Sequence, residues 1–296
     1  MARVQITADI TVRGGGILGL CIAWAAVLRG AQVRVIETHA IGAGSSGGVV
    51  GALTPHVPEN WNSKKAFQLD SLLMAQVFWQ GVGAASNLPT GYARLGRLQA
   101  IADSAALDLA HARAATAAQL WQGHAQWRLR PSTGAAWEPA SPTGMLIEDT
   151  LSARMHPRLA CAALCAAIRA RGGEVIVGAD APNQGAVIWA TGLAGLQDLT
   201  ADLGRPIGSG VKGQAALLAH DARDLPQIYA DSLHIVPHVD GTVGIGSTSE
   251  NQWQDASDTD ARLDALLARA RDVLPALQGA QVLQRWAGVR PRASSR

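Results

Sequence analysis

The chain has 296 residues, of which 48% are apolar and 16% are charged, and its formal net charge is +2. This length and composition suit a globular protein with a large core and two domains, and they exclude an intrinsically disordered chain. The small net charge, with no run of basic residues interleaved with aromatics, argues against a nucleic-acid partner.

The first apolar segment predicts a strand, a helix and a second strand rather than a secretion signal or a membrane span. The apolar run at 17–28 has about a dozen residues, well short of the roughly 20 that cross a bilayer. No A-x-A cleavage site follows it. Arg29 and Gly30 end the run, and a new apolar segment begins at Val33. We therefore predict a helix between two short strands, with no transmembrane segment.

Glycines between the first strand, at 10–13, and the helix fit the pattern G-x-G-x-x-G. Gly14 allows a tight turn, Gly16 lets the backbone approach a pyrophosphate, and Gly19 lets the helix lie close on the sheet. The helix would direct its N-terminal N–H groups at the phosphates. Glu37, which ends the second strand, can bind the ribose hydroxyls and repel a 2′-phosphate. The motif predicts a dinucleotide site; the alternative is a glycine-rich helix start that binds no ligand.

A glycine–serine cluster at 42–48 runs directly into apolar residues. Small residues inside ordered chain predict a backbone that passes close to something flat or crowded. A helix is then expected from a cap at Asn62 or Ser63 to about Gln80. Its apolar face is predicted at Ala66, Leu69, Leu73 and Val77.

The middle and the end of the chain predict further strands and helices. They are a strand at 96–102, a helix at 104–120, a strand at 144–149, a helix from His156 to Gly172, and strands at 174–177 and 186–190. Antiparallel strands follow at 213–219, 234–248 and 282–291, with a hairpin turn at Asp240 and Gly241. The last predicted helix is capped by Ser257 or Asp258, and its apolar face is Leu263, Leu266, Leu267, Ala270 and Leu274.

This alternation predicts an α/β fold in which a Rossmann-like nucleotide-binding domain is interrupted by an α+β substrate domain with an antiparallel sheet. The nucleotide-binding domain would comprise 1–80 and 151–206, the substrate domain 81–150 and 207–285, and 286–296 would begin a segment that closes the nucleotide-binding domain.

The three cysteines do not predict a disulfide framework or a metal site. Cys161 and Cys165 share one predicted helix, and Cys21 lies on another, without histidines at ligand spacing. We expect small buried residues in a reducing compartment, and therefore a cytoplasmic protein that binds no metal.

Several short motifs occur in order along nearly the whole chain. They are GGGILGL, VRVIE, GAGSSGGVVGALTPH, HPRLACAAL, VIWATG, GVKGQ, HIVPHVDGTVGIGSTSE and WAGVRP. With these motifs the chain resembles the D-amino-acid oxidase and glycine oxidase (DAO) family of FAD-dependent oxidoreductases. The resemblance implies FAD as cofactor and oxidation of the C–N bond of a small amine or amino acid, such as glycine, sarcosine or a D-amino acid. Hydride would pass to flavin N5, with oxygen or a quinone as the final electron acceptor.

The resemblance also implies roles for individual residues. The pyrophosphate would lie against Gly14, Gly16, Ile17 and Gly19, and the adenosine ribose against Glu37. The pyrophosphate and flavin ring would be bordered by Ser45, Ser46, Gly47 and Gly51, the adenine by Val175, and the ribose and phosphates by Thr191 and Gly192.

The substrate is expected at Arg290, which matches a position where several family members bind a substrate carboxylate. A planar guanidinium suits that carboxylate because it can bind both oxygens. The alternative is an ordinary charge at a strand end. His56 is a weaker candidate, and His234 or His238 could also face the substrate; for each histidine the alternative is a structural or solvent-exposed residue.

Three other interpretations stay open. The family's sequence continues beyond the position of Arg296, which predicts a truncated and catalytically weak member. The dinucleotide motif alone also fits an NAD-dependent enzyme. A third interpretation is a flavin oxidase acting on an aminomethyl group of a tRNA base, which the near-neutral charge disfavours. The sequence leaves the oligomeric state open.

Overall fold

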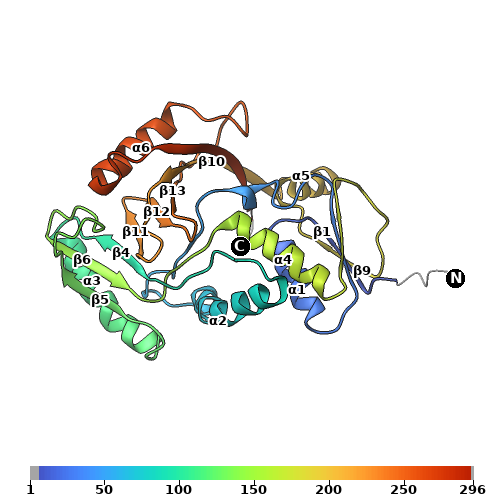
Figure 1. Cartoon of the computed structure of the whole chain (residues 1–296), viewed down its shortest axis with the longest axis horizontal. Helices are drawn as coiled ribbons and strands as arrows, with labels where there is room; N and C mark the ends of the chain where they lie inside the picture. The colour runs from blue at the N-terminus through green and yellow to red at the C-terminus, as the bar shows by residue number, and fades with distance from the viewer. Residues whose placement is uncertain (1–6, 295–296) are drawn as a thin grey trace.

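The computed structural model describes residues 7–294, which form two parts around two separate sheets (Figure 1). A four-stranded sheet builds one part and an eight-stranded sheet the other. The chain contributes to each sheet twice, in alternation. Within the described range, every helix is too short or too polar to span a bilayer.

The small sheet is parallel throughout and has the strand order β8-β2-β1-β9. Its strands are β1 (Ile10–Arg13), β2 (Val33–Glu37), β8 (Glu174–Val177) and β9 (Ala186–Trp189). The helices that pack on it are α1 (Ile17–Val27) and α4 (Pro157–Ala170). Helix α5 (Gly192–Leu203), which follows β9, packs instead against β10 (Gly208–Ala219) and β14 (Val282–Ala293) of the eight-stranded sheet. Its core is apolar and includes Val12, Leu20, Trp24, Val35, Leu164 and Ile168. The predicted α/β fold class, with a Rossmann-like sheet, is confirmed.

The large sheet combines strands from both inserted segments in the order β14-β10-β13-β12-β11-β4-β6-β5. These strands are β4 (Arg97–Ala100), β5 (Trp127–Pro131), β6 (Met145–Asp149), β10 (Gly208–Ala219), β11 (Gln227–Ala230), β12 (Leu233–Pro237), β13 (Thr242–Gly246) and β14 (Val282–Ala293). Neighbours are antiparallel except β4 and β11, which run parallel. The expectation of a purely antiparallel sheet is therefore wrong at this pair, because β4 and β11 come from different segments and no hairpin joins them.

The two faces of the large sheet differ, because side chains alternate along each strand. One face packs against α6 (Ala261–Val273) through a row that includes Ile228, Ile235 and Ile245. The register places Tyr229, His234 and Gly246 in line on the opposite face. A Cβ on Gly246 would lie 2.9 Å from Val50 Cγ2, so this second face meets the segment that follows the small sheet's first two strands.

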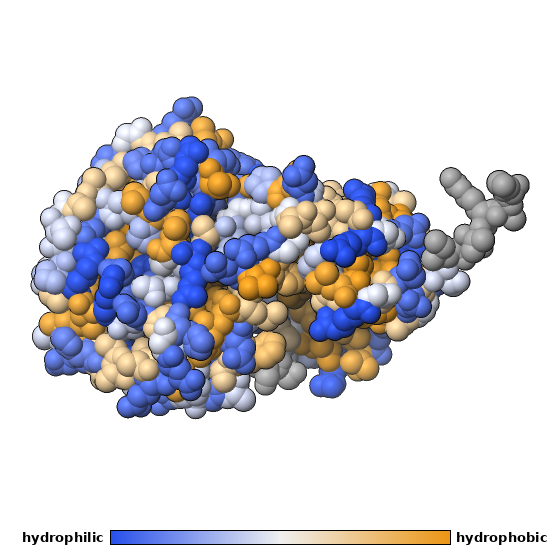
Figure 2. All heavy atoms as spheres, turned by 60° about the horizontal axis from the view of Figure 1, so that its bottom comes forward, coloured by the Kyte–Doolittle hydropathy of each residue, from blue (hydrophilic) through white to orange (hydrophobic). Residues whose placement is uncertain are grey.

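Helix α2 (Ser63–Ser86) is longer than predicted and packs against both parts. The Asn62 side chain caps it by accepting a hydrogen bond from the backbone N–H of Lys65, which confirms one of the two predicted caps. The buried residues are Leu72, Ala75, Trp79 and Val82. Val77 is 75% exposed, so its predicted place on the apolar face is wrong. The face turned forward in Figure 2, on the side of α2, shows apolar patches among hydrophilic side chains.

The cap of α6, the presence of α5 and two domain boundaries also differ from the prediction. Asp260 caps α6, instead of Ser257 or Asp258, and accepts from the backbone N–H of Arg262. Helix α5 was not predicted, because glycines in its first turns weaken the helical pattern. Two of the predicted domain boundaries fall inside elements. The boundary between residues 285 and 286 lies within β14, and the boundary between residues 80 and 81 lies within α2.

Candidate functional site

The carboxyl ends of the parallel strands bring together residues that are distant in sequence. β1 leads into Gly14, β2 ends at Glu37, and β9 leads through Ala190 to Thr191 at the same edge of the sheet. The Gly14 N–H donates to Ile36 O over 2.9 Å, which joins the first two of these strand ends. Ligands of open parallel sheets bind at this edge.

The turn after β1 has the geometry expected from the glycine motif. Gly14 has φ +110°, and a Cβ there would lie 2.4 Å from Ala190 O. A Cβ on Gly19 would lie 2.1 Å from Gly14 O, so α1 packs directly on the turn. A Cβ on Gly16 would meet nothing nearer than Ser46 Oγ, at 3.2 Å. At Gly16 the close neighbour is therefore the Ser46 side chain, and no backbone of another segment lies within 4 Å of the Cβ position.

The N-terminus of α1 is completed by a residue from another segment. Its own N-cap, Gly16, has no side chain, and the Ile17 N–H donates to Ser46 Oγ over 2.9 Å. Ser46 belongs to the short 3₁₀ turn η1 (Ser45–Gly47). The helix dipole and free N–H groups favour an anion such as a phosphate beside this turn.

Glu37 has a structural role that the sequence did not reveal. Its Oε2 accepts the Gly15 N–H over 2.8 Å, and its Oε1 accepts the His39 N–H over 2.9 Å. The Glu37 side chain is 14% exposed. Each carboxylate oxygen can accept more than one hydrogen bond, so the group can bind a ribose hydroxyl while it holds the turn.

The segment 48–51 leads from η1 to the large sheet. Gly48 lies against the Trp286 ring, since a Cβ on Gly48 would be 3.3 Å from the ring carbon Cη2. A Cβ on Gly244 of β13 would lie 2.0 Å from Val49 O. The glycine in β13 therefore permits direct contact between this segment and the sheet. Trp286 and Gly244 are site residues that the prediction missed.

Two polar side chains that were not predicted to contact the cofactor segment bind its backbone. Arg158 Nε donates to Gly47 O over 2.8 Å, and His238 Nε2 lies 3.0 Å from Val49 O. His238 is fully buried, so it does not face a solvent-filled substrate space.

The remaining predicted cofactor residues lie around this edge. Gly51 is needed for packing, because a Cβ there would lie 2.0 Å from Met155 O. Thr191 precedes α5 as its N-cap, and Gly192, at φ +62°, has open space around its Cβ position. Val175 is half-buried within β8, beside Val35 of β2, and so lies back from the strand ends.

The two predicted substrate residues are placed differently. Arg290 lies on β14, on the same face as Trp286, and it is exposed, with Nη2 donating to Thr248 O over 3.3 Å. The backbone N–H of His56 donates to Gln68 Oε1 over 2.7 Å, which ties His56 to α2. The Arg290 guanidinium therefore keeps most of its N–H groups available. Among the described residues, no hydrogen bond connects His56 to the motif glycines.

A polar cluster occupies the same face of the large sheet. Arg97 Nε lies 2.9 Å from Asp149 Oδ2, and both side chains are buried. The Arg97 guanidinium carbon is 5.5 Å from the centre of the Tyr229 ring, which lies 4.9 Å from the His234 ring. Burial lowers the pKa of His234 from 6.5 to about 4, and the charge of Arg97 contributes to the same shift. His234 is therefore a neutral hydrogen-bonding group at neutral pH.

The lowered pKa of His234 makes stability depend on pH. The unfolded chain binds this proton near pH 6.5 and the folded chain only near pH 4, so acid favours unfolding between these values. We expect His234→Gln to flatten the fall of unfolding free energy in this window by up to about 1.4 kcal/mol per pH unit. Urea titrations between pH 7 and pH 4 measure this, with the exposed His111→Gln as control. Equal slopes in wild type and His234→Gln would contradict the assignment.

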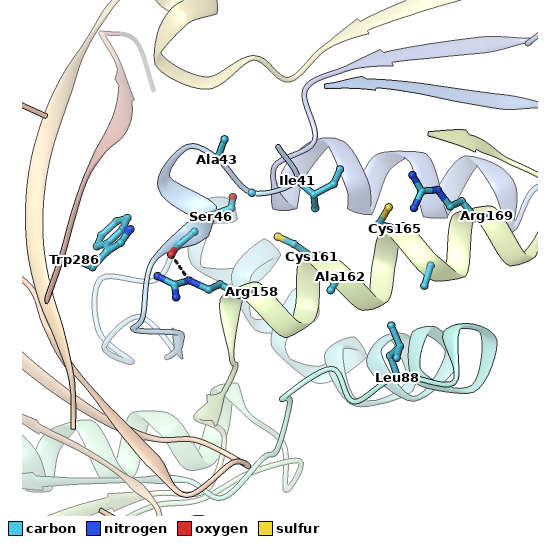
Figure 3. A pocket seen from close by; sticks show the side chains of 13 residues that line it. Ile41, Ala43, Ser46, Leu88, Arg158, Cys161, Ala162, Cys165, Arg169 and Trp286 are labelled. Atoms are coloured by element: carbon cyan, nitrogen blue, oxygen red, sulfur yellow. Dashed lines mark hydrogen bonds between the residues drawn. The ribbon is translucent and has the colours of Figure 1, made fainter. Parts of the chain in front are cut away.

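A groove of about 670 Å³ lies beside η1 along α4 (Figure 3). Its lining includes Ile41, Ser46, Leu88, Arg158, Cys161, Cys165, Arg169 and Trp286. Both arginines already bond to backbone carbonyls, Arg158 to Gly47 O and Arg169 to Val175 O over 3.1 Å. The groove borders the strand-edge site through Ser46 and Gly47, but the motif glycines do not line it.

Sequence comparison relates the chain to known flavoenzymes. The model of the DAO family, described as FAD dependent oxidoreductase, matches residues 9–296. Glycine oxidase from Pseudomonas putida is 39% identical over 82 residues, and glycine oxidase from Bacillus subtilis is 33% identical over 85 residues. Each match covers 27% of this chain and 22% of the relative, so it spans about a fifth of the relatives' length.

Solved structures share the fold over almost the whole chain. Glycine oxidase from Geobacillus kaustophilus superimposes with a TM-score of 0.78 at 20% identity, covering 97% of this chain and 83% of that one. Iminodiacetate oxidase from Chelativorans sp. BNC1 gives 0.79 at 21% identity, covering 97% and 84%. L-Amino acid deaminase from Proteus myxofaciens gives 0.79 at 15% identity, covering 100% and 83%. With the family match across residues 9–296, the chain belongs to the DAO family of FAD-dependent oxidoreductases.

Proposed function

We propose that this chain binds FAD at the carboxyl edge of β1, β2 and β9 and oxidises the C–N bond of a small amine or amino acid. The observation that carries the proposal is the glycine turn after β1, where a Cβ on Gly16 would meet a side chain, that of Ser46, and no backbone of another segment, next to the Ser45–Gly51 segment that reaches the large sheet. A dinucleotide placed at this turn would extend from the small sheet toward the polar face with His234. This is the layout that a flavoenzyme with a separate substrate domain requires.

The residues at the edge suit the parts of FAD. The N–H groups of α1 would hold the pyrophosphate beside Gly16, with Ser46 at the same helix end. Glu37 would accept hydrogen bonds from the adenosine ribose. Val175 would border the adenine, and Thr191 and Gly192 would lie near the phosphates.

When bound, FAD supplies the hydride acceptor for C–N oxidation. The chain's own residues would bind and orient the substrate. Arg290 would bind a carboxylate with the guanidinium N–H groups that its one bond, from Nη2 to Thr248 O among the described residues, leaves available. Tyr229 and neutral His234 would offer hydrogen bonds on the same sheet face. The names of the relatives, glycine oxidase and iminodiacetate oxidase, support a small amine that carries a carboxylate.

Anaerobic reduction of the flavin tests this function. We expect the purified chain to take up FAD from solution, with a bound-flavin spectrum, and to show no comparable affinity for NAD. We expect glycine, sarcosine, iminodiacetate or a D-amino acid to bleach the bound flavin, whereas the corresponding 2-hydroxy acids leave it oxidised. Bleaching by a hydroxy acid alone would contradict C–N oxidation, and NAD binding without flavin uptake would contradict the cofactor assignment.

A further inference from the structure

Two donors bind carbonyl groups that lie two residues apart in the segment 45–51. Arg158, in the first turn of α4, donates from Nε to Gly47 O over 2.8 Å (Figure 3). His238, which follows β12 on the large sheet, bonds through Nε2 to Val49 O over 3.0 Å. One part of the molecule supplies the first donor and the other part supplies the second.

Arg158 also links the two parts directly. Its Nη1 donates to Gln284 Oε1 on β14 over 2.8 Å. Trp286, two residues further along β14 and on the same face, lies against Gly48. The carbonyl of Gly47 and the strand β14 are therefore bound to one guanidinium, whose planar donor groups fix both directions at once.

The His238 imidazole makes one hydrogen bond among the described residues, from Nε2 to Val49 O. The residue is fully buried, and among the described residues its Nδ1 has no hydrogen-bond partner. A carbonyl oxygen can only accept, so Nε2 carries the proton and Nδ1 does not. Burial also lowers the pKa of His238 to about 4, which keeps the ring neutral. Burying Nδ1 without a partner costs free energy, and the hydrogen bond from Nε2 to Val49 O offsets part of that cost.

The surroundings of His238 restrict its ring further. A Cβ on Gly244 would lie 2.9 Å from His238 Nε2, so the glycine makes room for the bond to Val49. The centre of the His156 ring lies 4.6 Å from that of His238, and His156 Nε2 is 3.7 Å from Asp240 Oδ2. The ring is therefore packed against neighbours from β13 and from the residue that precedes α4.

We propose that Arg158 and His238 are positioning residues that fix the backbone of Gly47–Val49 between the two parts. This inference rests on the proposed function, because the segment 45–51 is where the cofactor would meet the substrate face. With both carbonyls held, the distance between the glycine turn and the large sheet stays constant. Without either donor, the segment gains alternative conformations and the flavin ring loses its defined environment.

Matched variants test this role. Arg158→Met removes one donor, and Arg169→Met is its control, because Arg169 is also exposed on α4 and also binds a backbone carbonyl, that of Val175. His238→Phe removes the second donor, whereas His238→Gln keeps an amide that can donate. Hydrogen exchange of the FAD-free protein reports on residues 45–55, and FAD affinity and the midpoint potential of the bound flavin report on the site.

We expect Arg158→Met and His238→Phe to accelerate exchange in residues 45–55 and to raise the Kd for FAD by about fivefold to tenfold, with a shifted flavin potential. Arg169→Met and His238→Gln should stay within about twofold of wild type. The proposal is overturned if residues 45–55 exchange as slowly in Arg158→Met as in Arg169→Met. It is also overturned if they exchange as fast in His238→Gln as in His238→Phe. If His238→Phe does not fold, His238→Met replaces it, because this flexible apolar side chain also lacks the donor. If wild type takes up no FAD, the proposed function fails, and the exchange data still decide the positioning role.

Discussion

Replacing Gly16 with valine is expected to weaken FAD binding by at least about 100-fold, or ~2.7 kcal/mol, without unfolding the protein. Gly16 has φ −80° and ψ 176°, a backbone conformation open to any residue. The Cβ of the added side chain would lie 3.2 Å from Ser46 Oγ, a tight contact with a side chain that can shift, and it would meet no backbone of another segment. It would instead occupy the space through which a pyrophosphate approaches the α1 N-terminus. Flavin fluorescence quenching on titration of the apoprotein measures the affinity.

Two further glycine variants separate cofactor binding from folding. Gly81→Val, on the exposed surface of α2 with open space at its Cβ position, should leave both FAD affinity and the melting temperature nearly unchanged. Gly19→Ala should instead destabilise the chain, since its Cβ would lie 2.1 Å from Gly14 O. A Gly16→Val protein that melts within about 3 °C of wild type and keeps wild-type FAD affinity would show that the pyrophosphate does not lie at this turn.

Replacing Arg290 with alanine is expected to raise KM for a carboxylate-bearing amine by about 100-fold, because a charge-assisted, two-point contact is lost. Among residues 7–294 the Arg290 side chain makes one hydrogen bond, the 3.3 Å contact to Thr248 O, so its removal costs little structure. FAD affinity should therefore change by less than about twofold. Arg290→Lys should be intermediate, because an ammonium group cannot bind both carboxylate oxygens in one plane. Steady-state rates over a range of substrate concentrations give KM, and titration of the apoprotein with FAD gives the affinity.

Arg292 provides the matched control for Arg290. It lies two residues further along β14, on the same face and exposed, and its partner in the register is Ser209 of β10. Arg292→Ala should leave KM close to the wild-type value. Wild type, Arg290→Ala and Arg292→Ala should oxidise an amine without a carboxylate equally well. Equal KM values for Arg290→Ala and Arg292→Ala would remove Arg290 from the substrate site.

Features that depend on neighbouring residues were predictable from the sequence. The glycine turn, the cap at Asn62 and the hairpin at Asp240 and Gly241 each follow from a few adjacent residues with strong backbone preferences. Gly241 has φ +81°, as its turn requires. The same local rules misplaced the cap of α6, because several residues before this helix are equally good caps and only packing selects Asp260.

Features that depend on tertiary structure carried no local signal. His238 and Val49 are separated by 189 positions, and Arg158 and Gly47 by 111. A single histidine or arginine has no spacing pattern that predicts such a partner. The parallel pairing of β4 with β11 is hidden for the same reason, because each strand alone reads like a strand of any sheet.

The alternation of the chain between the two sheets also sets the order in which the protein can fold during synthesis. β1 and β2 leave the ribosome early, but their outer neighbours, β9 and β8, are made only after the whole segment with β4, β5 and β6. Until then both edges of a two-stranded parallel ribbon are unpaired, and such a ribbon is unstable alone. Completion of the small sheet is thus a late, long-range step, and the unpaired edges of β1 and β2 stay exposed until β8 and β9 have been made.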